Sequence, residues 1–404
     1  MVGGGPAGFM AAITAAEQSS LSVLILEGGL KPLRKVLISG GGRCNVTNAC
    51  SDIRELITNY PRGGKSLFGL FHRFSTFDSV EWFQQRGLEL VTEQDGRIFP
   101  ATNSSKDVIN CLKKTAEDNG IHSLIQHNVI SIKKLPDKKF SIKCSNGKDF
   151  LANKVLISTG DHPSGRNLAS TLGHTIVEPT PSIFAFNFKK NIYKNCSGIS
   201  IDNVHLQLII GNKSFKEKGR ILITHKGISG PAVLRISAFA ARELYFSNYR
   251  SNLRINWVDC DELSCRNLLD RYRHQNGYKS IAKSKPFQFL PWRLWHTILE
   301  NSQIDLTIRW AELKNREIRS LEQLLIGSEC FIYSRGATGE EFVTAGGINL
   351  KEIDHNKMES RICSGLYFAG ELLNIDGVTG GFNFQHCWTS GWLAGMAISK
   401  KNKV

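Results

Sequence analysis

The sequence lacks the features that would place it in a membrane, in a zinc-binding class or in a dithiol class. No apolar run approaches the roughly 18 residues that a membrane helix needs, so we expect no membrane association. The ten cysteines are scattered without a C-x-x-C pair, which argues against a zinc site or a dithiol redox centre. Any redox chemistry would therefore have to come from a cofactor.

The chain also lacks internal repeats, low-complexity blocks and a basic stretch followed by an apolar core at its start. We therefore expect no secretory signal and a cytoplasmic location. With 404 residues, the chain exceeds the roughly 250–300 residues at which a single core stops growing. Two or more domains are expected.

Acidic residues are fewer than basic ones, with 36 against 51 and a net charge of +15. This excess favours anionic partners such as a phosphorylated cofactor or nucleic acid. The charge is diffuse, however, and residues 250–319 hold 13 Lys and Arg against 8 Asp and Glu. Because a nucleic-acid footprint needs a clustered stripe, we expect a solvated basic surface and no nucleic-acid partner.

The first chemical motif is the glycine run at residues 3–8, which fits G-x-G-x-x-G. A helix is expected over 6–17, followed by a short apolar strand over 23–26 that ends at Glu27. This spacing matches the dinucleotide-binding fingerprint, in which the glycines admit a pyrophosphate and the acid binds ribose hydroxyls. The alternative is a glycine-rich turn of an unrelated α/β unit.

The strand before this motif is short, because only Met1 and Val2 precede Gly3. A buried first strand normally runs about five residues. We therefore expect either a clipped strand or a true start upstream.

A second glycine run lies between Lys35 and Asn48, with the order Ser-Gly-Gly-Gly-Arg-Cys-Asn over residues 39–45. It suggests a loop whose backbone lies against a flat or anionic ligand, with Arg43 available for a phosphate. A flexible surface turn is the alternative.

Between residues 66 and 160 the patterns predict two helices, a strand, a hairpin and a strand that returns to the ligand edge. In order, these are a helix over 66–87, a helix from a Ser104/Asp107 capping box to Asn119, a strand over 128–134, a hairpin of 139–145 with 148–152, and a strand from Val155 that ends at Thr159-Gly160. This order suits FAD-type domains better than plain NAD domains, which continue with βαβ units.

The end of the chain gives a second strong signal. Residues 365–371 read as a strand that ends in Gly370-Glu371, and residues 376–383 lead through a glycine pair into a helix that reaches about Ser399. In this arrangement the acid would accept hydrogen bonds from ribitol hydroxyls, and the start of the helix would place N–H groups near a flavin ring. The alternative is a strand, loop and helix that merely close the sheet.

The fold class is therefore predicted as α/β: a Rossmann-like FAD-binding domain of the two-dinucleotide-binding type, with an inserted β-barrel that carries a helical subdomain. The expected bounds are 1–182 with 346–404 for the FAD-binding domain, 183–230 with 328–345 for the barrel, and 231–327 for the helical subdomain.

Together, the motifs GGGPAG, ISGGGRCNVTN, ITHKGISGPAVL, VTAGGINL and GLYFAGELLNIDGVTGGFN resemble the BaiN/RdsA family of NAD(P)/FAD-dependent oxidoreductases. The members of this family are also described as YhiN-type or aminoacetone-oxidase-like flavoproteins. The resemblance covers nearly the whole chain, and the SGGGRCN and DGVTGGFN segments are its most specific parts.

The resemblance implies FAD contacts along several segments of the chain. Together with the glycine fingerprint, it gives these candidate cofactor-binding residues: Gly3, Gly5, Pro6, Ala7, Gly8, Glu27, Lys35, Gly41, Gly42, Arg43, Cys44, Asn45, Val129, Thr159, Gly160, Gly370, Glu371, Gly380, Gly381, Phe382 and Asn383.

The expected function is hydride transfer at the flavin, with NAD(P)H as a transient reductant and a small organic substrate. Two alternatives stay open: an FAD-dependent oxidase of a small amine that uses oxygen, and a flavin-dependent RNA-modifying or RNA-binding protein. The sequence assigns no catalytic side chain, no metal and no oligomeric state.

Overall fold

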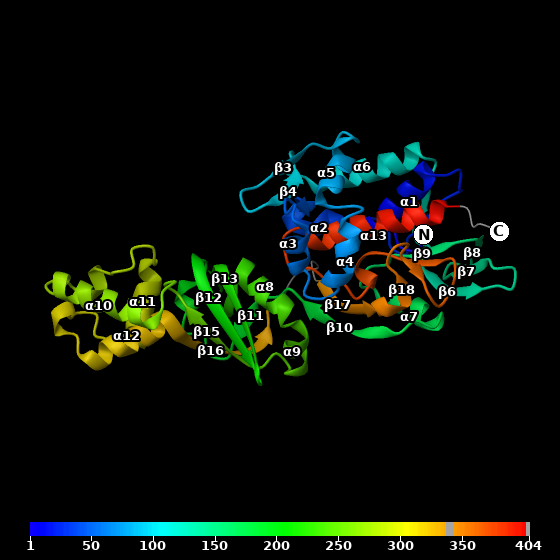
Figure 1. The fold of residues 1–404 in the computed structure, drawn as a ribbon. Helices are drawn as coiled ribbons and strands as arrows, with labels where there is room; N and C mark the ends of the chain where they lie inside the picture. The colour runs from blue at the N-terminus through cyan, green and yellow to red at the C-terminus, as the bar shows by residue number, and fades with distance from the viewer. Residues whose placement is uncertain (337–342, 401–404) are drawn as a thin grey trace. The chain divides into compact units, whose positions relative to one another are not determined.

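The computed structural model describes residues 1–336 and 343–400, which form two compact units (Figure 1). Unit 1 consists of Met1–Thr180 with Glu340–Val404, and unit 2 of Pro181–Gly339. Unit 1 is a Rossmann-type α/β domain, and unit 2 contains a closed antiparallel barrel with helices. The predicted fold class is confirmed.

The core of unit 1 is a parallel sheet of very short strands. β1 (Leu24–Leu26) pairs with β5 (His122–Leu124), and β9 (Val155–Ile157) pairs with β20 (Leu366–Phe368). Val2 lies between the two pairs and bridges both Leu26 and Ile157. β9 and β20 are fully buried, as in a parallel sheet covered on both faces, whereas β5 at the edge of the sheet is largely exposed. The spatial order β5-β1-Val2-β9-β20 follows from these pairings.

Two helices pack closely on one another in unit 1, α1 (Pro6–Glu17) and α13 (Phe382–Ser399). Their backbones approach at Gly391 and Gly395, where an added Cβ would lie 2.6 Å from the carbonyl oxygens of Ala7 and Ala11. Figure 1 shows the two helices, blue and red, side by side. This contact joins the start of the described chain to its end.

The remaining elements of unit 1 surround this sheet and helix pair. They are α2 (Arg34–Gly42), β2 (Thr47–Asn48), α3 (Ile53–Thr58), α4 (Gly64–Phe71), α5 (Thr76–Gln84), β3 (Leu90–Thr92), β4 (Arg97–Pro100), α6 (Ser105–Asp118), β6 (Val129–Lys134), β7 (Phe140–Cys144), β8 (Asp149–Ala152), α7 (Pro163–Thr171), β10 (Ile176–Ser182), β17 (Val343–Ile348), β18 (Ile353–Asp354) and β19 (Glu359–Ser360). β6, β7 and β8 form the expected meander, with the hairpin between β7 and β8.

Two local expectations are corrected. The single helix over 66–87 is two helices, α4 and α5, because Ser75 forms a capping box with Asp78 and starts a new helix. Conversely, Ser104 caps α6 without a side-chain hydrogen bond, and the Asp107 carboxylate accepts from the Thr102 hydroxyl instead.

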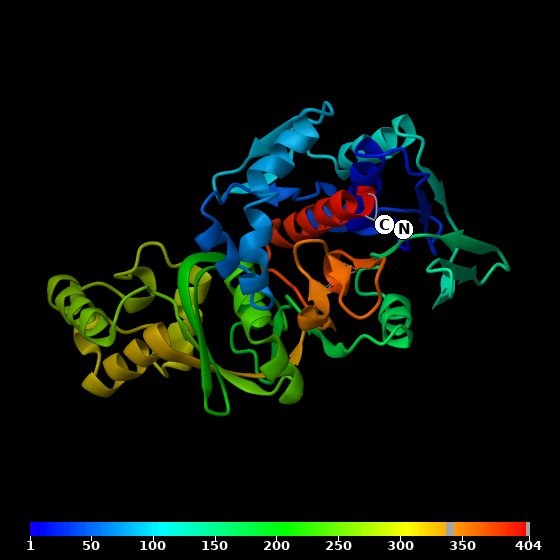
Figure 2. The ribbon, with the colours of Figure 1, turned by 45° about the vertical axis from the view of Figure 1, so that its right-hand side comes forward.

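Unit 2 is built on a closed six-stranded barrel with the order β11-β14-β13-β12-β15-β16. Its strands are β11 (Phe186–Phe188), β12 (Ser200–Ile210), β13 (Lys213–Ile223), β14 (Gly227–Ser229), β15 (Ser251–Asn256) and β16 (Ser328–Arg335). Figure 2 shows β12 and β13 as a long green hairpin. β15 falls inside the segment 231–327 that was expected to be helical, yet it pairs with both β12 and β16.

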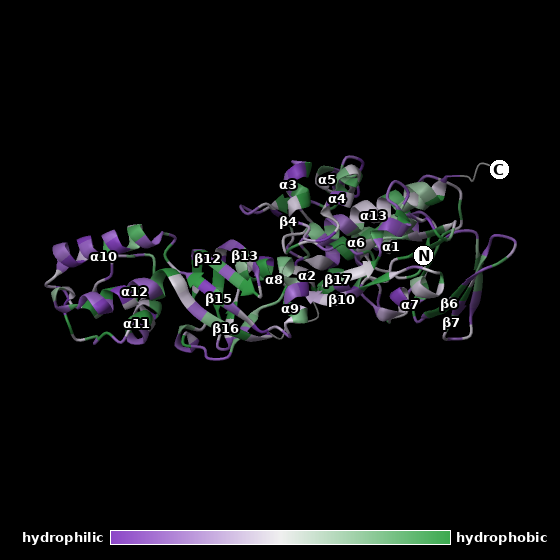
Figure 3. Ribbon diagram, turned by 60° about the horizontal axis from the view of Figure 1, so that its bottom comes forward, coloured by the Kyte–Doolittle hydropathy of each residue, from purple (hydrophilic) through white to green (hydrophobic). Residues whose placement is uncertain are grey.

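The helices of unit 2 pack on the barrel through a shared apolar core. They are α8 (Pro231–Phe239), α9 (Ala241–Phe246), α10 (Glu262–Asn276), α11 (Trp292–Asn301) and α12 (Asn315–Gly327). One buried cluster runs from barrel residues such as Leu206 to Trp295 and Trp310 between the helices. Figure 3 shows α10 as largely hydrophilic along its length. Among the described helices, none is long and apolar enough to cross a bilayer.

Candidate functional site

The first glycine loop crosses the sheet too tightly for side chains. Gly3 has φ +104°, and a Cβ there would lie 2.7 Å from the Ser158 carbonyl oxygen. A Cβ on Gly8 would lie 2.2 Å from the Gly3 carbonyl oxygen. Gly5 is the residue before α1, and Pro6, Ala7 and Gly8 form its first turn. The loop therefore leads directly into a helix N-terminus, where N–H groups and the helix dipole favour an anion.

Glu27 lies at the end of β1, beside this loop. Its carboxylate accepts hydrogen bonds from Gly4 N at 2.8 Å and from Gly29 N at 2.7 Å. A carboxylate has about four acceptor positions, so two remain for other donors such as ribose hydroxyls. Glu27 thus both fixes the glycine loop and can still accept from a ligand.

A cleft of about 980 Å³ opens in unit 1 next to the loop and Glu27. Four of the predicted residues line it: Gly3, Glu27, Val129 and Thr159. Four cationic residues line it as well: Lys31, Arg34, Lys106 and Lys113. The cleft therefore combines a dinucleotide fingerprint with positive charge, which suits a phosphorylated ligand.

Thr159 lines the cleft, but its hydroxyl is enclosed by the protein beside Gly165. Its Oγ1 atom is buried, yet no described residue hydrogen-bonds to it. Buried hydroxyls normally have a partner, and unpaired ones call for an explanation. Gly160 follows with φ +63°, at the same edge of the sheet.

The sequence prediction missed the two lysines of α6 that line the cleft. Lys106, Ile109, Asn110 and Lys113 have the spacing of one helical face, and all four line the cleft. This spacing was visible in the sequence. The missing information was the packing of α6 against α1 and α2.

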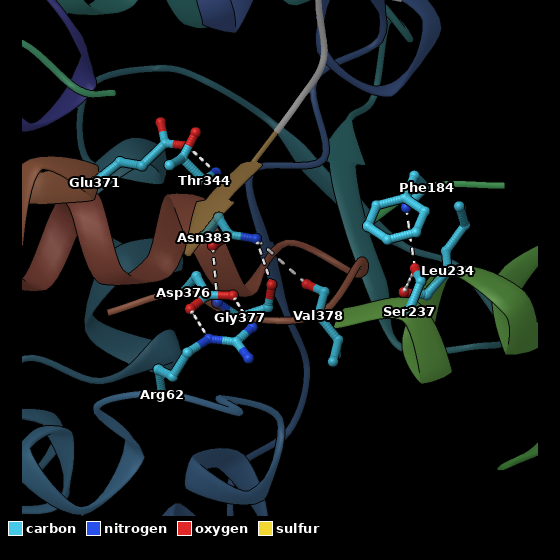
Figure 4. Close-up of polar contacts among 10 residues, drawn as sticks. All are labelled: Arg62, Phe184, Leu234, Ser237, Thr344, Glu371, Asp376, Gly377, Val378 and Asn383. Carbon is cyan, nitrogen blue, oxygen red and sulfur yellow. Dashed lines mark hydrogen bonds and ion pairs between the residues drawn. The ribbon is translucent and has the colours of Figure 1, made fainter. Parts of the chain in front are cut away.

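Lys35 joins two carboxylates behind the cleft. Its Nζ lies 2.5 Å from Glu371 Oε2 and 2.9 Å from Asp161 Oδ1. Burial raises the pKa of Glu371 against the opposing effect of Lys35. Burial alone would lower the Lys35 pKa, but the two carboxylates raise it above its ordinary value. Thr344 N also donates to Glu371 Oε1 at 3.0 Å (Figure 4). Asp161 was not among the predicted residues.

The second glycine run is a helix that breaks. α2 leaves helical geometry at Ser39–Gly41, and Gly41 and Gly42 have positive φ with no atom near their Cβ positions. Burial raises the pKa of the Cys44 thiol to about 12, so this cysteine is a poor nucleophile. These glycines border open space, as a ligand-facing loop requires.

Arg43 is already engaged within the protein. Its Nη2 lies 2.7 Å from Glu93 Oε1, and its guanidinium stacks 3.8 Å above the centroid of the Phe99 ring. The structure therefore directs this side chain to Glu93 and Phe99. Its expected contact with a phosphate stays a prediction.

The third group of predicted residues surrounds the start of α13. Gly381 has φ +92°, and a Cβ there would lie 2.4 Å from the Thr47 carbonyl oxygen. The Asn45 side-chain amide is oriented so that its oxygen and its nitrogen both have hydrogen-bond partners. Its oxygen accepts from Gly381 N at 2.9 Å, and its nitrogen donates to Thr47 O at 2.8 Å. Asn48 Nδ2 donates to Gly380 O at 3.0 Å. Residues of the second glycine segment thus hold the Gly380-Gly381 pair in place.

Phe382 and Asn383 are tied to their own neighbourhood. The Phe382 carbonyl accepts from the buried Tyr60 hydroxyl at 2.7 Å. Asn383 accepts from Gly377 N at 2.9 Å and donates to Gly377 O at 2.8 Å (Figure 4). These bonds give the Asn383 side chain a role in shaping the loop before α13.

A buried ion pair that the sequence did not reveal holds the other side of this loop. Arg62 Nε donates to Asp376 Oδ1 at 2.5 Å, and its Nη2 donates to Oδ2 (Figure 4). The Asp376 side chain is fully buried. Asp376 precedes a glycine and could be suspected from the sequence, but nothing in the pattern pairs it with a residue 314 positions away.

A Rossmann sheet with a glycine loop, an acid-tipped strand and a basic cleft defines a dinucleotide-binding protein, here of the FAD-dependent oxidoreductase class. The chain belongs to the HI0933-like family, whose Rossmann-domain model matches residues 1–397. The family resemblance read from the motifs is confirmed, as is the enzyme class.

Two curated relatives match nearly the whole chain. The 3-dehydro-bile acid delta(4,6)-reductase of Clostridium scindens is 28% identical over 99% of this chain and 98% of the relative. The ribosomal RNA dihydrouridine synthase of Escherichia coli is 27% identical over 97% of this chain and 95% of the relative. Both alignments therefore run through both units of this chain.

A solved structure supports the fold. The 3-ketosteroid-delta4-(5alpha)-dehydrogenase of Rhodococcus jostii RHA1 aligns with a TM-score of 0.52 at 13% identity, over 99% of this chain and 96% of that one. At this identity the likeness concerns the fold alone.

Proposed function

We propose that this chain reduces a carbon–carbon double bond of its substrate, using FAD that is in turn reduced by NAD(P)H. The observation that carries the proposal is the cleft of about 980 Å³ bordered by Gly3, Glu27 and Thr159. The names of the two relatives support reduction, since one is a reductase and the other forms dihydrouridine, which is uridine with one ring double bond reduced.

The residues present fit FAD. The Gly3–Gly8 loop and α1 would hold the pyrophosphate, Glu27 the ribose, and the Val129 main chain the adenine. The predicted segments Gly41–Asn45, Gly370-Glu371 and Gly380–Asn383 would lie along the rest of the cofactor. When bound, FAD supplies the hydride chemistry, and the protein supplies orientation and charge.

Lys35 would place a fixed positive charge beside the cofactor site. Its ammonium is held between Glu371 and Asp161, so it stays protonated at neutral pH and carries no proton to the substrate. Arg62 and Asp376 would keep the loop before α13 in one conformation. No side chain of unit 1 is assigned as a proton donor.

We propose a small organic molecule as the first candidate substrate. A uridine in RNA is the second candidate, favoured by the net charge of +15 and by the E. coli relative. An amine oxidase that uses oxygen remains the alternative reaction.

Anaerobic mixing with NADH or NADPH tests the reaction. We expect at least one of them to bleach the absorbance of the bound flavin near 450 nm in a stopped-flow experiment. A flavin that neither nucleotide reduces, but that a small amine bleaches, would replace the reductase by the oxidase.

Gly5→Ala tests the cofactor contact. A Cβ at Gly5 would lie 3.8 Å from its nearest neighbour, Ser158 O, so the fold accepts it. The methyl group would, however, occupy space that a pyrophosphate must approach. We expect FAD affinity to fall at least about tenfold, measured by flavin fluorescence quenching, which is a loss of about 1.4 kcal/mol in binding.

The matched control is Gly69→Ala in α4, where a Cβ would also meet no clash. It should leave FAD affinity unchanged. Equal FAD affinity of Gly5→Ala and the wild-type protein would remove the glycine loop from the cofactor site.

A further inference from the structure

Residues 271–299 of unit 2 carry positive charge without any acidic residue. The stretch holds six Lys or Arg side chains and no Asp or Glu: Arg271, Arg273, Lys279, Lys283, Lys285 and Arg293. The structure describes every residue of the stretch, and none of the six forms an ion pair with a described carboxylate. None of the six is therefore held by a carboxylate at ion-pair distance, in contrast to Arg266 just before, which pairs with Glu262 and Glu322.

A buried lysine shapes the turn in this stretch. Lys285 is 3% exposed, and its Nζ donates to Gln288 O at 2.7 Å and to Phe287 O at 3.3 Å. The same ammonium lies 4.7 Å from the centroid of the Trp292 ring, a cation–π distance. Lys285 therefore fixes the turn from inside.

This turn presents large aromatic side chains to solvent. Tyr278 is 70% exposed, Phe289 59% and Trp292 45%. The backbone of this segment is held by a buried hydrogen bond, in which Trp295 Nε1 donates to Ile281 O at 3.0 Å. Exposed aromatic residues on a fixed backbone are typical of binding surfaces, because little conformational entropy is lost when a partner covers them.

We propose that the segment 278–293 of unit 2 binds single-stranded RNA. The basic–aromatic surface consists of Tyr278, Lys279, Lys283, Phe289, Trp292 and Arg293. Its cations would neutralise phosphates, and its aromatic rings would stack on unpaired bases. The proposal rests on the second candidate substrate of the proposed function, a uridine in RNA, and it assigns RNA docking to residues of unit 2.

The charge part is tested on the FAD-loaded, full-length protein. The probe is a fluorescein-labelled 20-nucleotide oligouridylate, titrated by anisotropy between 50 and 200 mM salt. For single-stranded nucleic acids, each phosphate contact contributes about −0.7 to the slope of log K against log salt concentration. We expect K279A/K283A/R293A to reduce the magnitude of this slope by about 2.

The aromatic part is tested by F289A/W292A. Loss of two stacking rings should weaken binding at least tenfold at fixed salt, since each ring is worth about 1–3 kcal/mol, and the salt slope should stay unchanged. This separation of affinity from salt slope distinguishes stacking from a general loss of structure.

Matched controls come from exposed residues elsewhere in the chain. K133A/K148A/K351A removes three exposed lysines of unit 1, and F77A/F246A removes two aromatic side chains that are 72% and 74% exposed. Both controls should bind RNA as the wild type does. RNA binding by the surface variants equal to that of their controls would overturn the proposal, as would binding to phosphatidylglycerol vesicles without binding to RNA.

The visible flavin spectrum separates this proposal from the proposed function. A variant that keeps its flavin and is bleached by NAD(P)H, but loses RNA, supports the surface. A wild-type protein that is bleached yet never binds the oligonucleotide overturns the surface and leaves the reductase standing. A protein that binds RNA but whose flavin neither nucleotide reduces overturns the reductase alone.

Discussion

Replacing both Gly391 and Gly395 by alanine is expected to lower the free energy of unfolding by about 2 kcal/mol. Overpacking of a filled site costs about 1–3 kcal/mol per substitution, which exceeds the gain of up to about 1 kcal/mol per glycine in helix propensity. The clash is with backbone that cannot turn away, since both new Cβ atoms would lie 2.6 Å from carbonyl oxygens of α1. Urea unfolding of the FAD-bound protein, followed by flavin release, measures the loss.

Gly69→Ala is the control for this pair. Gly69 is also inside a helix, but no atom lies within 4 Å of its Cβ position. The substitution should therefore stabilise the protein by about 0.5–1 kcal/mol through helix propensity. If the α13 variants were as stable as this control, the close contact of α1 with α13 would be incorrect.

The second large effect is a loss of stability in acid through His386. The ring is buried, its Nε2 contacts Gly370 O at 3.2 Å, and burial lowers its pKa from 6.5 to about 4. The native state therefore keeps His386 neutral, while the unfolded state protonates below pH 6.5. The stability is fully present above pH 6.5 and is lost as the pH falls towards 4. We expect a loss of about 2–3 kcal/mol between pH 7 and pH 4.5 from this residue.

His386→Gln should remove this part of the pH dependence while retaining a side-chain donor near Gly370. Urea unfolding at pH 7 and pH 4.5 gives the comparison, and His122→Gln, at an exposed histidine, controls for the loss of one imidazole. An unchanged pH dependence in His386→Gln would show that the ring is charged or exposed in the native protein. Burial lowers the pKa of His174 as well, so part of the acid effect should persist in the variant.

The outline of the fold was predictable because its signals are local. The G-x-G-x-x-G loop, the strand to Glu27 and the Asn146-Gly147 hairpin depend on spacings of a few residues, and the structure has each of them. β15 was missed although residues 252–257 alternate polar and apolar side chains, because the helical patterns on both sides led to one helical assignment for 231–327. Its pairing with β12 and β16 places it in the barrel.

The candidate site was predictable in its segments but not in its contacts. Asp161 joins Lys35 across 126 positions of sequence, and Arg62 joins Asp376 across 314. No periodicity predicts such pairs, since each joins segments that only the tertiary fold brings together. The same reason explains Arg43, whose side chain was expected at a phosphate and is held by Glu93.

The order of strands in the parallel sheet has a consequence for synthesis on the ribosome. β9 ends at Ile157 and its neighbour β20 begins at Leu366, with all six barrel strands encoded between them. At about 5–20 residues per second, roughly 10–40 seconds separate the emergence of the two strands. The last barrel strand, β16, ends at Arg335, 31 residues before β20 begins, so the barrel can complete its pairing while β9 still has an open edge. The strands of the barrel are therefore all synthesised before the parallel sheet of unit 1 receives β20.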